Sequence, residues 1–316
     1  MQETKQDRNL GAVMLAAAGI ILFSSKAILV KKAYIYTVDP LSLLLMRMLF
    51  VLPVYTFIAI VSSWGKKGKD RLSRKEILFL ILLGLGGYYL SSLLDFAGLK
   101  HITASLERLI LFIYPTLVVL ITAFLYRKPI PHKQIWAIAI TYFGIFLVFN
   151  QEAGLHNQAY KWLGPLMIFG CAVTYASYLV GSGQLIPRIG SVRFTSYVML
   201  VSTSAVILHA WVAGHVHILH FPKEVYRISI GLSIIATLLP SFMISEAIRR
   251  LGASKVAIIS SIGPISTIIL ASIFLGERLN AFQWLGAVIV ISGVMLVNIE
   301  KGMNTREKKD QRKLAA

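Results

Sequence analysis

Five ionisable residues lie inside apolar stretches of this chain: Lys26, Arg47, Asp95, Glu107 and Arg108. A lone charge in an apolar interior is costly, so charged side chains found there pair with one another or serve a function. Three cations and two anions can largely neutralise each other if they meet at one level. We therefore predict one charge cluster that binds or gates a small polar molecule. The alternatives are a purely structural ion-pair lattice and, for Lys26 and Arg108, snorkelling towards water.

The surrounding composition is that of a membrane protein. Mean hydropathy is +0.71 and 56% of residues are hydrophobic. Apolar stretches of roughly 20 residues recur along the chain, long enough to cross about 30 Å of hydrocarbon. The single cysteine, Cys171, lies inside one of them, which excludes a disulfide framework. We predict ten spans, near residues 10–30, 41–63, 77–97, 104–125, 134–150, 162–185, 192–213, 228–248, 254–274 and 281–299.

The net charge of +18 could indicate nucleic-acid binding, but its distribution argues for membrane orientation instead. With the span ends assigned alternately, 22 of the 32 Lys and Arg residues fall on the side of the N-terminus and seven on the other. The positive-inside rule then predicts ten crossings with both termini cytoplasmic, and no nucleic-acid partner. The chain divides into a cytoplasmic segment 1–9, a five-helix unit 10–150, an external linker 151–161, a second unit 162–299 and a basic cytoplasmic tail 300–316.

The two units are related in sequence. Shifting the chain by 149 residues gives ten identities over the 45 positions 104–148, and among them Pro115 matches Pro264 and Gly144 matches Gly293. Nearer the N-terminus the shift becomes 153, and Ser24 matches Ser177. Because each unit has an odd number of spans, five, the second unit enters the bilayer with the opposite orientation to the first. We therefore predict an all-α membrane protein whose ten transmembrane helices form two inverted five-helix repeats, the symmetry used for alternating access in transporters.

Helix position places the five charges at a similar depth towards the outer surface. Arg47 and Asp95 would pair if their helices face one another, and Arg47 would then bind or gate the transported molecule. The mirrored group, Glu246 with the adjacent pair Arg249 and Arg250, comes at the inner end of its span, where it is either a gate or a solvated helix end.

Tyrosines and a serine near the matched prolines predict a moderately polar cavity, with ordinary packing as the alternative for each tyrosine alone. These residues are Tyr88, Tyr114, Tyr175, Ser177 and Tyr178.

Motifs for other chemistry are absent from the sequence. There is no G-x-x-x-x-G-K-[ST] loop for a nucleotide, no H-E-x-x-H and no G-x-S-x-G. We therefore expect no enzyme activity, no cofactor and no bound metal.

One segment resembles a known family. Ala253-Ser254, Gly263-Pro264 and Leu275-Gly276-Glu277-Arg278-Leu279, followed by an apolar span with two glycines, are similar to the repeat of EamA-type members of the drug/metabolite transporter superfamily. The first unit matches through Ala104-Ser105 and Pro115. The resemblance covers almost the whole chain and implies a central cavity formed mainly by spans one to four and six to nine.

These features together indicate a bacterial inner-membrane secondary transporter that exports a small polar or amphipathic metabolite, such as an amino acid. Proton coupling would use Asp95 or Glu107, although a neighbouring arginine would keep either carboxylate charged; an uncoupled facilitator is the other possibility. A flippase for lipid or lipid-linked sugar and an intramembrane lipid-modifying enzyme are the remaining alternatives. The expected partners are a small-molecule substrate and the lipid bilayer, with the chain acting as a monomer or homodimer.

Overall fold

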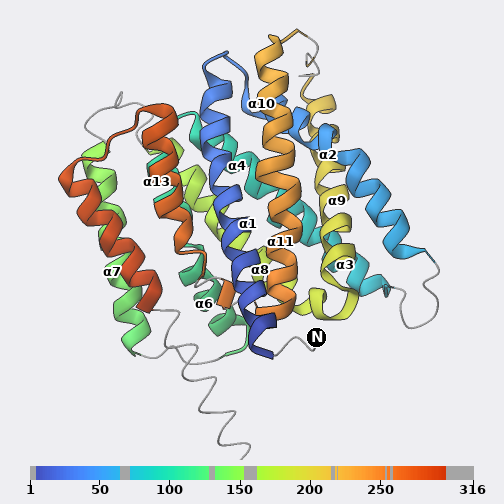
Figure 1. Cartoon of the computed structure of the whole chain (residues 1–316), viewed down its shortest axis with the longest axis horizontal. Coiled ribbons are helices and arrows are strands. Elements are labelled where there is room, and N and C mark those ends of the chain that lie inside the picture. Colours follow the sequence, from blue (N-terminus) through green and yellow to red (C-terminus); the bar gives the residue numbers. More distant parts are fainter. Residues whose placement is uncertain are drawn as a thin grey trace, which may run out of the picture.

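The computed structural model describes residues 5–64, 72–127, 132–152, 162–214, 218, 220–252, 255–256 and 259–296. Within these ranges it contains helices joined by turns and no strand (Figure 1). The predicted tail 300–316, nearly all of the linker 151–161 and the repeated pair Ala253-Ser254 lie outside the described residues.

The described helices follow the predicted apolar segments. In the first unit they are α1 (Lys5–Tyr34), α2 (Pro40–Ser63), α3 (Arg74–Leu82), η2 (Leu83–Leu90), α4 (Ser91–Leu99), α5 (Ala104–Leu111), α6 (Tyr114–Leu125) and α7 (His132–Glu152). In the second they are α8 (Leu163–Ile189), α9 (Ser191–Val212), α10 (Lys223–Ser233), η4 (Ile234–Leu238), α11 (Leu239–Leu251) and α13 (Ile262–Leu275), followed by a helix over 281–296.

Seven helices among the described residues are long and apolar enough to cross a membrane. Three shorter apolar helices, at Ile135–Val148, Ile262–Leu275 and Ala281–Leu296, accompany them. The chain is therefore an all-helical, multi-pass membrane protein.

Local sequence sets the helix ends. The Asp39 carboxylate accepts a hydrogen bond of 2.9 Å from the Ser42 N–H at the start of α2, and the Thr103 hydroxyl accepts one of 3.1 Å from the Leu106 N–H at the start of α5. Each satisfies a backbone donor that the first helical turn leaves free. Gly190 and Gly252 follow α8 and α11 with φ of 84° and 83°, a conformation that glycine adopts readily.

Two kinds of interruption occur once in each unit. The apolar helix Arg74–Leu99 contains the π-helix η2, and the apolar helix Lys223–Leu251 contains the π-helix η4. The helical hydrogen-bond pattern also breaks at residues 112–113, just before Pro115, and at 260–261, just before Pro264. Proline lacks the N–H that would continue a helix, so a break just before each proline is expected.

Helix α1 lies near the middle of the bundle, and α7 lies at one edge (Figure 1). Helix α1 packs on α11 and α13 from the second unit, while α8 packs on α4 and α6 from the first. Helices α2 and α9 pack on each other. Helix α7 approaches the helix over 281–296 through Gly144 and Gly286, where a methyl group on either glycine would collide with the other's carbonyl oxygen at 2.8 Å. This arrangement surrounds a cavity with helices from both units.

Candidate functional site

The five charged residues predicted from the sequence are all buried, with exposed fractions of 5% or less. Lys26 on α1, Arg47 on α2, Asp95 on α4 and Arg108 on α5 line the central cavity. Glu107 is fully buried behind them and contacts Lys26. The cavity is completed by residues of η2, α6, α8 and α11.

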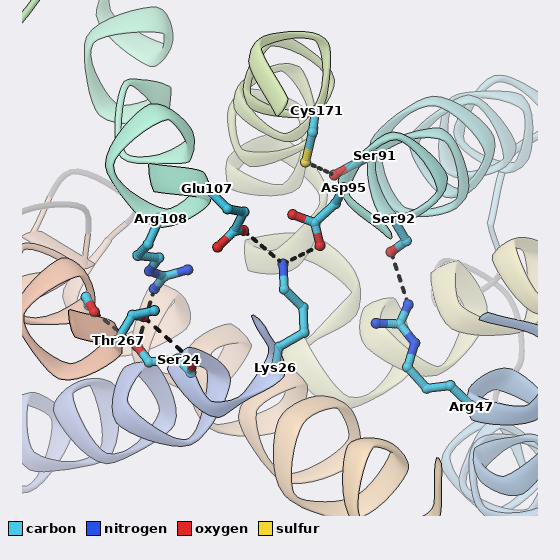
Figure 2. A network of polar contacts seen from close by, with 11 residues as sticks. Ser24, Lys26, Arg47, Ser91, Ser92, Asp95, Glu107, Arg108, Cys171 and Thr267 are labelled. Atoms are coloured by element: carbon cyan, nitrogen blue, oxygen red, sulfur yellow. Dashed lines mark hydrogen bonds and ion pairs between the residues drawn. The ribbon is translucent and has the colours of Figure 1, made fainter. Parts of the chain in front are cut away.

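Lys26 lies between the two carboxylates (Figure 2). Its Nζ is 2.6 Å from Asp95 Oδ2 and 3.6 Å from Glu107 Oε1. The ammonium also lies 4.9 Å from the centre of the Phe23 ring. Three helices, α1, α4 and α5, therefore contribute one ionisable group each to a trio of two acids and one base.

Arg47 is not paired with Asp95, contrary to the expectation from the sequence. Its Nη2 donates a hydrogen bond of 3.0 Å to the Ser92 hydroxyl, and its guanidinium carbon lies 4.8 Å from the centre of the Phe96 ring. The prediction was wrong because the nearest cation to Asp95 comes from α1, whose position beside α4 cannot be read from helix depth alone. Arg47 Nε has no hydrogen-bond partner.

Arg108 packs against the second unit. Its Nη2 lies 3.5 Å from the Ser24 hydroxyl, and the Phe23 ring centre is 5.5 Å from its guanidinium carbon. The guanidinium fits over Gly263, where an added methyl group would collide with Nη2. The Ser24 hydroxyl reaches the Gly263 carbonyl at 3.2 Å, so α1, α5 and α13 meet here.

Four tyrosines line the same cavity and form one cluster, the tyrosine wall. Tyr114 and Tyr175 meet edge to face with ring centres 5.1 Å apart, Tyr175 and Tyr178 stack at 5.9 Å, and Tyr88 meets Tyr178 edge to face at 5.8 Å. Gly87 allows η2 to approach α8 this closely, because a methyl group at Gly87 would collide with Tyr178 Cβ. The structure thus brings together all four tyrosines that the sequence singled out.

Two predicted site residues lie elsewhere. Ser177 is exposed, and its hydroxyl donates to the Val173 carbonyl of its own helix at 2.9 Å. The expectation relied on its match to Ser24, but equivalent positions in two repeats need not face the same surroundings. Glu246 also lies outside the cavity lining, at the end of α11, where Arg249, Arg250 and the Ser191 hydroxyl bind its carboxylate.

Sequence analysis missed Glu277, which follows α13. Its Oε1 accepts a hydrogen bond of 2.9 Å from the Ala104 N–H, and its Oε2 accepts bonds of 3.0 and 2.7 Å from the Ser105 N–H and hydroxyl. The carboxylate therefore caps α5, a helix of the other unit. A signal was available in the sequence. Ala104-Ser105 at the start of α5 and Glu277 after α13 are expected at the same depth in the membrane, so a carboxylate and free N–H groups could meet there.

Ser92, the hydrogen-bond partner of Arg47, was not among the site residues predicted from the sequence. Ser91 beside it lies 3.3 Å from the Cys171 sulfur, so the cavity lining of α4 is polar.

The comparisons with known proteins agree with this arrangement. The EamA-like transporter family matches residues 10–150 and 162–299. The chain is 32% identical over 291 residues to the uncharacterized transporter YcbK of Bacillus subtilis (strain 168), covering 90% of this chain and 92% of that protein. It is 26% identical to the uncharacterized transporter YyaM of the same strain, covering 74% of this chain and 78% of YyaM.

A relative in Synechocystis sp. (strain ATCC 27184 / PCC 6803 / Kazusa), the uncharacterized transporter sll1319, is 25% identical over 82% of this chain and 79% of its own length. A solved crystal structure superposes with a TM-score of 0.62 over 92% of this chain and 97% of that chain, at 16% identity, which supports the fold alone. With residues 10–150 and 162–299 matched and a relative above 30% identity, this chain belongs to the EamA-like transporter family.

Proposed function

We propose that this membrane transporter exports small organic metabolites by alternating access, through the cavity between its two units. The observation that carries the proposal is the cavity itself, which is lined by three buried cations, one carboxylate and four tyrosines at the centre of an otherwise apolar bundle. Ionisable side chains at such a position are costly, and in membrane proteins they mark the path of a substrate or an ion.

The mechanism requires two units related by inversion, and the helix packing supports that relation. Several contacts between the units have a counterpart when the units are exchanged. The packing of α1 on α11 corresponds to that of α8 on α4, and the packing of α1 on α13 corresponds to that of α8 on α6. The packing of α2 on α10 likewise corresponds to that of α9 on η2.

Two further pairs each join equivalent helices of the two units. They are α2 with α9, and α7 with the helix over 281–296. A two-fold axis passing between the members of these pairs fits these contacts. The π-helices and the two breaks before proline follow the exchange approximately: under the 149-residue shift 112–113 corresponds to 261–262, one residue from the break at 260–261. Irregular helix segments are suitable hinges, because their backbone already departs from the regular pattern of α-helical hydrogen bonds.

Coupling to protons would use the trio of Lys26, Asp95 and Glu107. Two carboxylates share one ammonium there, so uptake of a single proton leaves a neutral ion pair and a neutral acid. A proton released when the trio rearranges would link the solute cycle to the proton gradient.

The test is transport in proteoliposomes containing the purified protein, with a panel of radiolabelled metabolites and an imposed pH gradient. We expect accumulation of at least one solute that collapses when the pH gradient is removed. Arg47→Ala should abolish it, and the exposed Arg227→Ala should serve as the matched control. Normal transport by Arg47→Ala would contradict the role of the cavity, whereas transport that ignores the pH gradient would contradict only the coupling.

A further inference from the structure

We propose that the cavity is built for an organic monocarboxylate without an amino group, whose carboxylate binds Arg47 and whose flat apolar body lies against the tyrosines. The proposal rests on the transport role given above and narrows its substrate class.

The charge balance of the buried cluster requires an anion. The buried cluster holds three bases, Lys26, Arg47 and Arg108, and only two acids, Asp95 and Glu107. Even with both acids ionised, at least one positive charge is in excess, and burial of an unpaired charge is unfavourable unless a counter-charge binds. A negative charge supplied by a solute reduces this excess.

Arg47 is the cation that remains available. Both carboxylates contact Lys26, and among the described residues neither arginine forms an ion pair. The one side-chain hydrogen bond of Arg47 goes to the neutral Ser92 hydroxyl, and its Nε is buried without a hydrogen-bond partner. Its exposed fraction is 2%, yet it lines the cavity. A planar guanidinium with free donors matches the two oxygens of a carboxylate.

Arg108 also lines the cavity with an Nε that has no hydrogen-bond partner, but its guanidinium is more enclosed. Gly263, Ser24 and the Phe23 ring surround it, so Arg108 adds positive potential to the site and offers a solute fewer open donors than Arg47 does. Arg47 and Arg108 lie on opposite sides of Lys26 (Figure 2), which leaves the carboxylate of the solute on the Arg47 side.

The same charge balance argues against an amine on the solute. An ammonium group would cancel the charge of the solute's own carboxylate, so a zwitterion would leave the excess positive charge of the site in place. The one carboxylate in the cavity lining, Asp95, already contacts Lys26 through Oδ2 at 2.6 Å and has only Oδ1 left to offer an ammonium group.

The tyrosine wall defines the rest of the solute. Tyr88 and Tyr178 line the cavity together with Arg47, and Tyr175 stacks on Tyr178 with a ring-plane angle of 23°. Aromatic rings favour offset-stacked and edge-to-face contacts with another ring. A phenyl-sized body attached to the carboxylate by a short chain meets both requirements.

Four probes of matched shape test the proposal by calorimetric titration of the purified full chain in detergent. They are 3-phenylpropanoate, its neutral amide, the cation 3-phenylpropylamine and phenylalanine, which carries both groups. We expect 3-phenylpropanoate to bind at least tenfold more tightly than each of the others. Arg47→Gln should weaken its binding at least tenfold, while Arg227→Gln should leave it unchanged.

Equal or tighter binding of the amide, the amine or phenylalanine would overturn the proposal, and so would binding of none of the four. The comparison among probes on the unmodified protein stays decisive even if Arg47→Gln fails to fold. Failure of the transport role is a separate result, in which 3-phenylpropanoate binds with the expected preference but proteoliposomes carry out no transport of it.

Discussion

Lys26 is the residue on which the buried charges depend most. It is the only cation that contacts both Asp95 and Glu107 among the described residues, so its loss leaves two neighbouring buried carboxylates without their shared counter-charge. Breaking a buried pair by removing one partner typically costs about 3–5 kcal/mol.

We expect Lys26→Met to lower the melting temperature by several degrees, as measured by intrinsic fluorescence in detergent. Adding Asp95→Asn should restore part of the loss, because one buried negative charge is then removed. The exposed Lys223→Met is the control, since its ammonium lies outside the cavity. A melting temperature for Lys26→Met equal to that of Lys223→Met would show that the trio does not stabilise the fold.

The depth of the charges could be predicted from sequence, because helix rise converts residue number into position along a span. Their partners could not. Ser91 and Asp95, four residues apart, mark a polar face of α4 in the sequence, but nothing in the sequence says which helix packs against that face or how α1 is rotated about its axis. Glu277 was missed for a related reason: an acidic residue after a helix is usually solvated, and its donors are more than 170 positions away in the chain.

At the level of helices, neighbouring glycines of η2 provide a matched comparison. A methyl group at Gly87 would collide with Tyr178 Cβ, whereas a methyl group at Gly86 would meet nothing within 4 Å. Because Cβ cannot move without its backbone, Gly87→Ala must push η2 away from α8.

We expect Gly87→Ala to destabilise the protein by about 1–3 kcal/mol, the usual cost of overpacking. Gly86→Ala should be neutral or slightly stabilising, because alanine favours helix by up to about 1 kcal/mol over glycine. Chemical unfolding of the two variants in mixed micelles measures the difference. Equal stability of the two would mean that η2 and α8 do not pack as described.

Glu277 joins the end of α13 to the start of α5, and Lys31 adds to this junction by donating to the Leu99 and Ile102 carbonyls at 3.1 and 2.8 Å. These contacts fasten the end of the bundle that lies away from the N-terminus. Hydrogen bonds to a charged group contribute about 1.5–3 kcal/mol each when one partner is removed.

Glu277→Ala should therefore populate states open at that end. In a Cys171→Ser background carrying Ser92→Cys, we expect a membrane-impermeant maleimide applied from that side to react several-fold faster once Glu277→Ala is added. Glu224→Ala, which alters an exposed carboxylate in the first turn of α10, should leave the rate unchanged. An unchanged rate in Glu277→Ala would assign the carboxylate a capping role only.

For the whole molecule, the order and approximate bounds of the helices could be predicted. The lengths of the apolar stretches and the 149-residue shift can both be read directly from the sequence. The predicted start of the ninth span at residue 254 was less informative, because the helix there breaks at 260–261 before continuing as α13. A hydropathy window averages over such a break.

Orientation in the membrane is a prediction that follows from the basic residues. Reporter fusions after Lys69 and after residue 316 should report a cytoplasmic location, and a fusion at Gly214 an external one, because 22 basic residues lie on one side and seven on the other. The amount of each fusion protein in the membrane, measured in parallel, controls for differences in expression. An external signal from the C-terminal fusion would require an odd number of crossings or the opposite orientation.

The unequal number of buried cations and anions also bears on the electrical behaviour of the transport cycle. When all five groups are ionised, the empty site keeps one excess positive charge and senses the membrane potential whenever it changes sides. A unit charge crossing the full field gains or loses about 2.3 kcal/mol per 100 mV. A site loaded with a monoanion is neutral and reorients without sensing it. During export, an interior-negative potential would therefore speed the return of the empty carrier and leave the outward step unaffected. Current recordings on supported membranes should show charge movement in solute-free protein that a saturating monoanion suppresses.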